Sequence, residues 1–260
     1  MLPPLTTSGK ASSRRSRAMR AMLVVRERAP DRCGLAVAGQ GGFHRNVEIE
    51  YTAYVMPAVE VVWRHLLDGA RRGQRRWSSM TAVASELEAP ISTVHRSLSH
   101  PIEIGAVSIT AMGGLQVLDP ARLLVLFAAH RHVQRDITRR FQVGLPASEV
   151  ESLVRSPTVI LGGFGAVVAH LEGVNRIADY TTVLFYGDPE LPDLPPASGY
   201  EGTEVLIAEP DPLLKKYGRV TPFSHAYADL FSLPGWQSAR FVEELDLREV
   251  AASDEPVLLV

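Results

Sequence analysis

The stretch from residue 57 to residue 119 constrains the fold most, because three helical patterns there precede two apolar runs joined by glycines. The first pattern, PAVEVVWRHLLDGARRG, places its apolar residues three and four positions apart, as one buried helix face requires. The second, WSSMTAVASELEAP, begins with serines suited to helix capping and ends at Pro90. The third, ISTVHRSLSHP, ends at Pro101. The following GAVSITAMGGLQVLDP predicts two strands that turn at Gly113 and Gly114.

This order of three helices and a hairpin is the plan of a winged helix-turn-helix domain, in which residues 107–117 form the wing. The third helix, over residues 91–100, is then the recognition helix. Val94 and Leu98 are four residues apart and anchor it on the core. The side chains predicted to face outward near its N-terminal half are Ser92, Thr93, His95 and Arg96.

The chemistry of these side chains suits DNA. Arg96 can donate two hydrogen bonds to a guanine, and the hydroxyls of Ser92 and Thr93 suit phosphates, aided by the helix N-terminus. Four arginines follow the first helix and are expected to lie along the DNA backbone: Arg71, Arg72, Arg75 and Arg76. The remaining predicted contact is Ser79, at the start of the second helix.

The alternative for this region is a set of ordinary capped surface helices with solvated arginines. The ordered set of elements and the local basic charge favour DNA binding over that alternative. Glu88 occupies the turn between the second and third helices, where glycine is common, so the geometry of this turn is open.

Charge divides the chain into two halves. Residues 1–145 carry 20 Lys and Arg against 11 Asp and Glu, a net charge of +9, whereas residues 146–260 carry 7 against 18, a net charge of −11. Such asymmetry is typical of two modules with different partners, because a basic half attracts polyanions and an acidic half repels them.

The predicted fold class is α+β, with an N-terminal winged helix-turn-helix domain over residues 57–119. Residues 1–56 are Ser/Arg-rich and Gly-rich without a regular period, and they indicate either a disordered basic arm or an extension upstream of the true start. Residues 120–145 are predicted to form a linker helix that begins at Pro120, with Asp119 as its cap. Residues 146–260 are predicted to form an acidic α+β interaction domain with a small mixed sheet and helices.

The acidic half also carries a weak sign of nucleotide binding. Gly163 and Gly165 lie between a predicted strand and helix, and Asp188 follows 25 positions after Gly163 at the end of the next strand. Val168 occupies the place of the third glycine of a dinucleotide fingerprint. A nucleotide- or ligand-sensing regulator or small enzyme is therefore the alternative function, and close packing of strand and helix is the simpler explanation of the glycines.

No catalytic constellation is found, so no enzymatic activity and no cofactor or metal are expected. Ser224 and His225 are adjacent and would point about 100° apart on a helix. Cys33 is the single cysteine, which excludes an intrachain disulfide and fits a reducing compartment. No apolar run approaches the roughly 20 residues that span a bilayer, so we expect a cytoplasmic protein without a membrane partner.

Five stretches taken together resemble a known family. They are STVHRSL, GAVSI, LDPARLLVLFAAHR, TVILGGFGAVVAHL and YADLFSLPGWQSARFVEEL. They are similar to the AbiEi-like antitoxins of bacterial type IV toxin–antitoxin systems and to related actinobacterial winged-helix transcriptional regulators, over residues 57–247. The resemblance implies a repressor that binds double-stranded operator DNA at inverted repeats and regulates its own gene. It also implies a C-terminal domain with antitoxin activity and, as partner, a nucleotidyltransferase-like toxin encoded beside it. A homodimer on a palindromic operator is expected from the symmetry of such sites.

Overall fold

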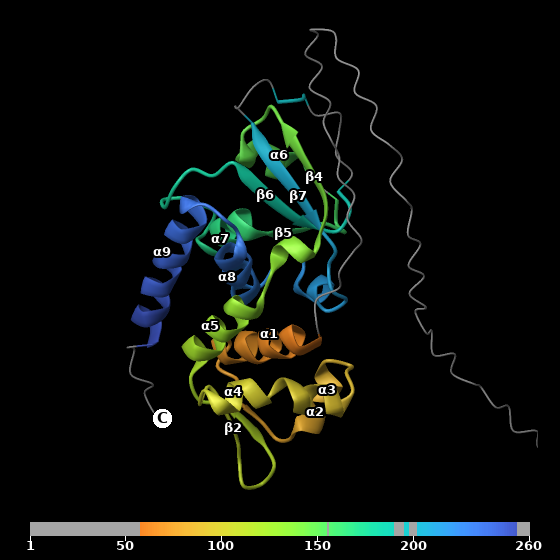
Figure 1. Cartoon of the computed structure of the whole chain (residues 1–260), viewed down its shortest axis with the longest axis vertical. Helices are drawn as coiled ribbons and strands as arrows, with labels where there is room; N and C mark the ends of the chain where they lie inside the picture. Colours follow the sequence, from red (N-terminus) through yellow and green to blue (C-terminus); the bar gives the residue numbers. More distant parts are fainter. Residues whose placement is uncertain (1–57, 155, 190–194, 198–201, 254–260) are drawn as a thin grey trace, which may run out of the picture. The chain divides into compact units, whose positions relative to one another are not determined.

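The structure is a computed structural model that describes residues 58–154, 156–189, 195–197 and 202–253. The predicted N-terminal arm, residues 1–56, and Cys33 lie outside the described residues. Over the described residues the fold is mixed α+β, as predicted, with one three-stranded and one four-stranded sheet (Figure 1).

The N-terminal part of the described chain contains the predicted helices and hairpin, with two additions: a short strand before the second helix and an extra short helix. Its elements are α1 (Ala58–Arg71), β1 (Arg76–Trp77), α2 (Met80–Glu86), α3 (Ile91–Ser97), α4 (Ser99–Glu103), β2 (Val107–Ile109) and β3 (Leu115–Val117). The strands form an antiparallel sheet in the order β1-β3-β2. Gly113 has a φ of 78°, so the hairpin turns where the glycine pair predicted it.

The predicted recognition helix over residues 91–100 is wrong in its extent. α3 ends at Ser97, and α4 follows after Leu98 with Pro101 as its third residue. Proline is tolerated there because the amide hydrogens of a first helical turn have no partner within the helix. Pro101 therefore lies inside a new helix and does not terminate the preceding one.

The C-terminal part consists of a mixed sheet with helices on both faces. Its helices are α5 (Pro120–His130), α6 (Ala147–Leu153), α7 (Gly163–His170), α8 (Phe223–Ser232) and α9 (Trp236–Ser253). Its strands are β4 (Ile137–Val143), β5 (Ile160–Gly162), β6 (Thr182–Tyr186) and β7 (Thr203–Ala208). The strand order is β4-β7-β6-β5, with β6 and β7 parallel and the other pairs antiparallel.

The alternation of side chains along the strands explains the two faces of this sheet. On β6, Val183 and Phe185 pack with α6 residues such as Val150, whereas Leu184 and Tyr186 belong to the larger core with α7 and α8. Successive residues of a strand point to opposite faces, so both faces of β6 must be covered. The apolar run TVLFY satisfies that requirement.

The predicted linker helix over residues 120–145 is also wrong. α5 begins at Pro120, and the Asp119 side chain caps it by accepting from the Arg122 amide, as predicted, but the helix ends at His130. A 3-10 turn follows, and residues 137–143 form β4, which pairs with β7. The sequence ITRRFQV is rich in β-branched and aromatic residues, and pairing with a buried strand stabilises it as a strand.

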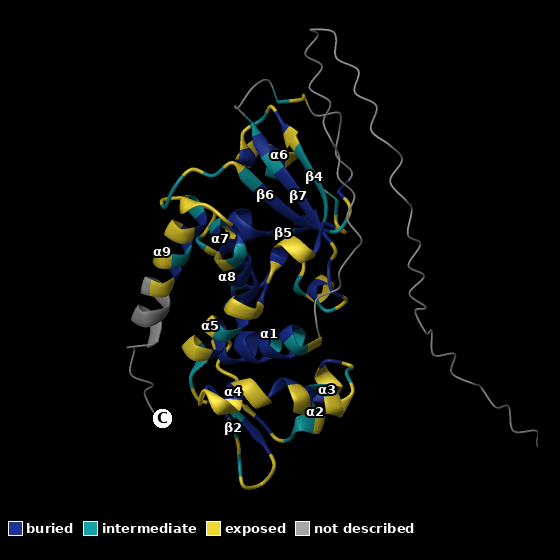
Figure 2. Cartoon of the chain, viewed as in Figure 1, coloured by how far each residue is buried: buried dark blue, intermediate teal, exposed yellow. Residues whose placement is uncertain are grey.

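Helix α1 is buried on two sides. Its predicted apolar face, which includes Trp63 and Leu66, is buried, but so are the charged residues Glu60, Arg64 and Asp68. α1 contacts α3 on one side and α5 and α8 on the other, and Figure 2 shows buried residues along most of it. The helix is therefore shared between the N-terminal and C-terminal parts.

Candidate nucleic-acid interface

Helix α3 presents a polar side to its surroundings, as predicted. Ser92, His95 and Arg96 are exposed, and Thr93 is half-buried. Val94 and Leu98 are fully buried and hold the helix on the core. The side chains predicted to face outward are thus available on one short helix.

The position of α3 is fixed by contacts with α1. The indole nitrogen of Trp63, which is itself buried, donates to the carbonyl oxygen of Ser97. The Ser97 hydroxyl donates to the carbonyl oxygen of Val94 at 2.7 Å. Because these groups are buried and hydrogen-bonded, the helix end is held rigidly under its exposed residues.

Arg96 is an exposed cation in the last turn of α3. Its Nε donates to the carbonyl oxygen of Ser92 at 3.3 Å, which holds the side chain along its own helix. The side chain is exposed and its guanidinium carries further donors, so it can rotate toward a phosphate or a base edge.

The other predicted contact residues lie at the strand β1 and the start of α2. Arg76 pairs with Gln116 of β3, and the carbonyl oxygen of Arg75 accepts from the Val117 amide, so both exposed arginines belong to the sheet that carries the wing. The Ser79 oxygen caps α2 by accepting from the Ala82 amide at 3.1 Å. A serine cap of this helix was predicted from the sequence.

Two exposed segments of this part are the tip of the wing and the turn between α2 and α3. Met112, at the tip of the hairpin, is 93% exposed. In the turn between α2 and α3, Glu88 has a φ of 52°, the left-handed region that favours glycine. The Glu88 carboxylate accepts from Lys216 at 2.9 Å, a contact with the C-terminal part of the chain. The turn thus forms with a glutamate in the place where glycine is common.

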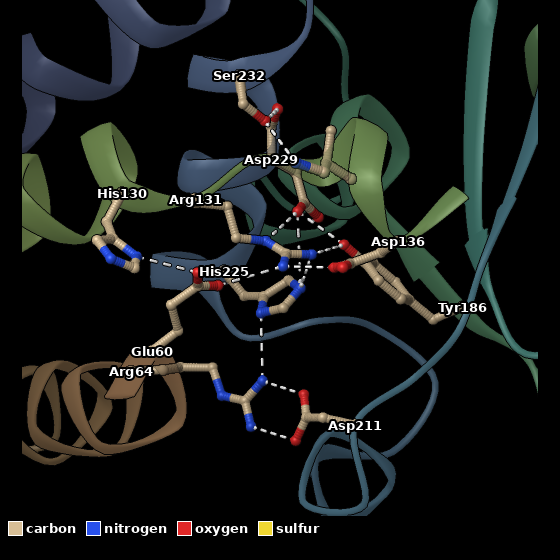
Figure 3. A network of polar contacts seen from close by, with 11 residues as sticks. Glu60, Arg64, His130, Arg131, Asp136, Tyr186, Asp211, His225, Asp229 and Ser232 are labelled. Carbon is tan, nitrogen blue, oxygen red and sulfur yellow. Dashed lines mark hydrogen bonds and ion pairs between the residues drawn. The ribbon is translucent and has the colours of Figure 1, made fainter. Parts of the chain in front are cut away.

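A buried network of charges lies where α1 meets the C-terminal part of the chain (Figure 3). Arg131 is its centre, and the side chain is 1% exposed. Its nitrogens contact the carboxylates of Glu60, Asp136 and Asp229 and the hydroxyl of Tyr186. Tyr186 in turn donates to Asp229 at 2.7 Å. Because these residues come from α1, the residue after α5, the segment before β4, β6 and α8, the network joins both parts of the chain.

A second buried arginine extends this network. Arg64 forms a bidentate pair with Asp211, with nitrogen–oxygen distances of 2.6 and 2.9 Å. The His225 ring lies between the two arginines, with Nδ1 3.2 Å from Arg64 and Nε2 3.5 Å from Arg131. Nearby, the Ser224 hydroxyl donates to Asp68 of α1.

The electrostatics of the network follow from burial and from neighbouring charges. Burial, together with the guanidinium groups of Arg131 and Arg64, lowers the pKa of His225 well below its usual range, so the ring is neutral. Burial raises the pKa of Asp229 to about 6, although Arg131 opposes the shift. Ser224 and His225 bond to different partners, so their adjacency in sequence creates no nucleophile–base pair.

Sequence reasoning did not predict this network. Glu60, Arg64 and Asp68 recur at four-residue spacing on α1, a pattern that is typical of a solvated helix face. Their partners Arg131, Asp211 and Ser224 lie 71 to 156 residues away in sequence. No local pattern marks such distant partners.

Gly163 and Gly165, on which the nucleotide-binding alternative rests, lie at closely packed positions. Gly163 has a φ of 52°, and a Cβ at Gly165 would collide with the Glu151 carboxylate. β5 and β6 pair antiparallel, whereas a dinucleotide fingerprint joins parallel strands. Asp188 is exposed and pairs with Arg139 at 3.0 Å. The geometry therefore fits the simpler explanation, close packing of the strand and the helix.

Within the described ranges, no three or more His, Cys, Asp or Glu side chains are grouped so that they could hold a metal ion. Among the helices that the structure describes, none has the length and apolar character needed to cross a membrane.

The chain matches no protein-family model, no curated protein and no solved structure. The resemblance of the five stretches to AbiEi-like antitoxins therefore stays a prediction.

Proposed function

We propose that residues 57–119 form a winged helix-turn-helix domain that binds double-stranded operator DNA through α3, and that the protein is a transcriptional regulator. The observation that carries the proposal is the element order α1, β1, α2, α3, α4, β2, β3 with the sheet order β1-β3-β2. Apart from the extra short helix α4, this order is that of a winged helix-turn-helix domain. In such a domain the third helix enters the major groove, and here that helix has an exposed polar side.

Each contact residue has a role in this proposal. Arg96 reads a base edge, His95 and Thr93 contact neighbouring bases or phosphates, and Ser92 donates to a phosphate. Arg75 and Arg76 neutralise phosphates, which gives affinity without sequence preference. Although the Ser79 oxygen caps α2, its hydroxyl hydrogen remains able to donate to a phosphate.

We further propose that the protein is an autoregulating antitoxin in the cytoplasm, with a nucleotidyltransferase-like toxin as partner. The resemblance over residues 57–247 supports this part of the proposal. The charge of the acidic half, −11 over residues 146–260, supports a C-terminal part that stays away from DNA and contacts a protein. Two copies on an inverted repeat would double the contact with DNA.

Fluorescence anisotropy of the full chain on the labelled DNA upstream of its own gene tests DNA binding. We expect a preference of about 10³ or more over a scrambled duplex, together with weaker binding at higher salt. Arg96→Ala should weaken operator binding by about 1–3 kcal/mol and relax the preference at one base. Arg240→Ala is the matched control, because it removes the same charge from an exposed position on α9.

Two results would contradict the proposal. Equal affinity for operator and scrambled duplex would mean that the chain has only a basic surface. An unchanged affinity of the Arg96→Ala protein would mean that α3 is not the reading helix. For the antitoxin part, co-expression with the product of the adjacent gene should relieve any toxicity of that product, and unrelieved toxicity would exclude the role.

A further inference from the structure

A cavity lies in the C-terminal part, between α6, the end of α7 and the residues that lead into β6 and β7. Its volume is about 720 Å³, within the range of roughly 300–1,000 Å³ that small-molecule sites occupy. Residues that line it include Glu151, Val168, Asn175, Tyr180, Thr181 and Thr203. None of residues 58–119 lines it, so an occupant of this cavity would not compete directly with DNA on α3.

The Glu151 carboxylate is placed at this cavity by the packing of α6. Val150, the preceding residue, is fully buried against the sheet. Glu151 then projects toward α7, where Gly165 leaves room for its carboxylate. A side chain at position 165 would collide with that carboxylate, so the second glycine of the GFG sequence is needed for this arrangement.

Tyr180 fixes the carboxylate from the other side. Its hydroxyl lies 3.0 and 3.2 Å from the two oxygens of Glu151 and donates to them. The Tyr180 ring stacks on Phe164, with centroids 5.0 Å apart and an interplanar angle of 9°. It also meets the edge of Phe241 at 6.0 Å. Aromatic contacts on this ring hold the pair in place before any ligand arrives.

The charged side chains that line the cavity determine whether it favours a cation or an anion. Among the residues that the structure describes, the lining includes the carboxylates of Glu151 and Asp179 and contains no Lys, Arg or His. Burial raises the pKa of Glu151 to about 7, while the hydrogen bond from Tyr180 opposes the shift. A cation beside Glu151 would favour its ionised form, whereas a phosphate would be repelled by both carboxylates.

We propose that this cavity is a binding site for a small organic cation, an alkylammonium or guanidinium compound, with Glu151 as its counter-ion and Tyr180 as the residue that positions Glu151. This proposal does not rest on DNA binding. It assigns to the C-terminal part a ligand of the opposite charge to the nucleotide that the glycine pattern suggested.

Isothermal titration calorimetry of the full chain with agmatine, putrescine and AMP tests the site. We expect agmatine or putrescine to bind with a Kd below about 1 mM and AMP to give no binding. Glu151→Gln should weaken cation binding at least about tenfold, the effect expected when one charge-assisted contact is lost. Glu149→Gln is the matched control, because Glu149 lies exposed on the same helix outside the cavity lining, and its affinity should be unchanged.

A second readout uses the unmodified protein, so it does not depend on the folding of any variant. Titrations at pH 7 in two buffers of different ionisation enthalpy should show release of about half a proton per cation bound, since Glu151 must lose its proton. Tyr180 is the group that donates to this carboxylate, and the described part of the lining contains no basic side chain. The proposal is overturned by absence of cation binding at 10 mM ligand (roughly ten times the expected upper Kd), by absence of proton release, or by equal weakening in the two glutamate variants.

Discussion

The arginines of this chain lie in two contrasting environments. Arg96 is exposed on α3, where its guanidinium can reach a ligand, whereas Arg131 is buried among three carboxylates. Removing an exposed arginine changes binding and leaves stability nearly unchanged. Removing Arg131 would leave buried carboxylates without their cation, which typically costs about 3–5 kcal/mol. The environment of each arginine, rather than its residue type, therefore determines its role.

The raised pKa of Glu151 predicts that the stability of the folded protein depends on pH. Its pKa is raised from 4.5 to about 7, so between these pH values the folded protein holds a proton that the unfolded chain has released. The stabilisation from this protonated carboxyl is fully present below pH 4.5 and is lost as the pH rises through about 7. The wild-type protein should therefore lose up to about 3 kcal/mol relative to Glu151→Gln between pH 5 and pH 8.

Urea unfolding of both proteins at several pH values, without added ligand, measures this difference. Glu149→Gln serves as the control, because it makes the same substitution at an exposed position of the same helix. If the stability difference between wild type and Glu151→Gln were the same at pH 5 and pH 8, the carboxyl would titrate as an ordinary glutamate and the prediction would be wrong.

At the scale of elements, periodicity predicts where an apolar face lies but not what covers a polar one. The helices α1, α2 and α8 could be predicted because their apolar residues recur at helical spacing. The exposure of Ser92 and Arg96 could be predicted as well, since Val94 and Leu98 define the buried side of α3. The ends of α3 and α5 could not, because Pro101 is accepted in a new helical turn and residues 137–143 become a strand by pairing with β7.

The polar face of α1 shows the same limit for the candidate site. Glu60, Arg64 and Asp68 are buried because α5, α8 and the Asp211 segment cover them. The partner of Arg64 at Asp211 is 147 residues away. The periodicity of a single helix carries no information about a partner so far away in the sequence. The buried network could therefore be recognised only in the three-dimensional structure.

The buried Arg64–Asp211 pair joins α1 to the segment after β7, and its contribution to stability can be predicted. Arg64→Met and Asp211→Leu should each destabilise the protein by about 3–5 kcal/mol, because each leaves one buried charge without its partner. The double variant should be less destabilised than the sum of the two, by at least about 1 kcal/mol. Urea unfolding of the four proteins measures this coupling.

The exposed pair Arg240–Glu243 provides the comparison, since its side chains are 58% and 61% exposed. The same cycle there should give a coupling of about 0.5 kcal/mol or less. Additive effects at Arg64 and Asp211 would show that this pair does not hold α1 against the C-terminal part.

At the scale of the whole described chain, one core crosses the predicted domain boundary at residue 119. A single cluster of buried residues includes Val62 and Leu115 from the N-terminal part and Tyr227 and Leu245 from the C-terminal part. The charge network crosses the same boundary through α1. Because α1 contributes to both, neither part can lose its structure without exposing buried surface of the other.

This continuity predicts one cooperative unfolding transition. Trp63 and Trp77 lie buried in the N-terminal part, whereas Trp236 of α9 is 67% exposed. The fluorescence change on unfolding therefore reports mainly the N-terminal part, while far-UV circular dichroism reports all helices and strands. The two melting curves should coincide. Leu115→Ala, which creates a cavity under the wing and costs about 2–5 kcal/mol, should move both curves together to lower temperature. If the tryptophan signal of this variant melted first while most circular dichroism remained, the two parts would be separate folding units, and the shared helix α1 would not couple the proposed DNA-binding side to the C-terminal part.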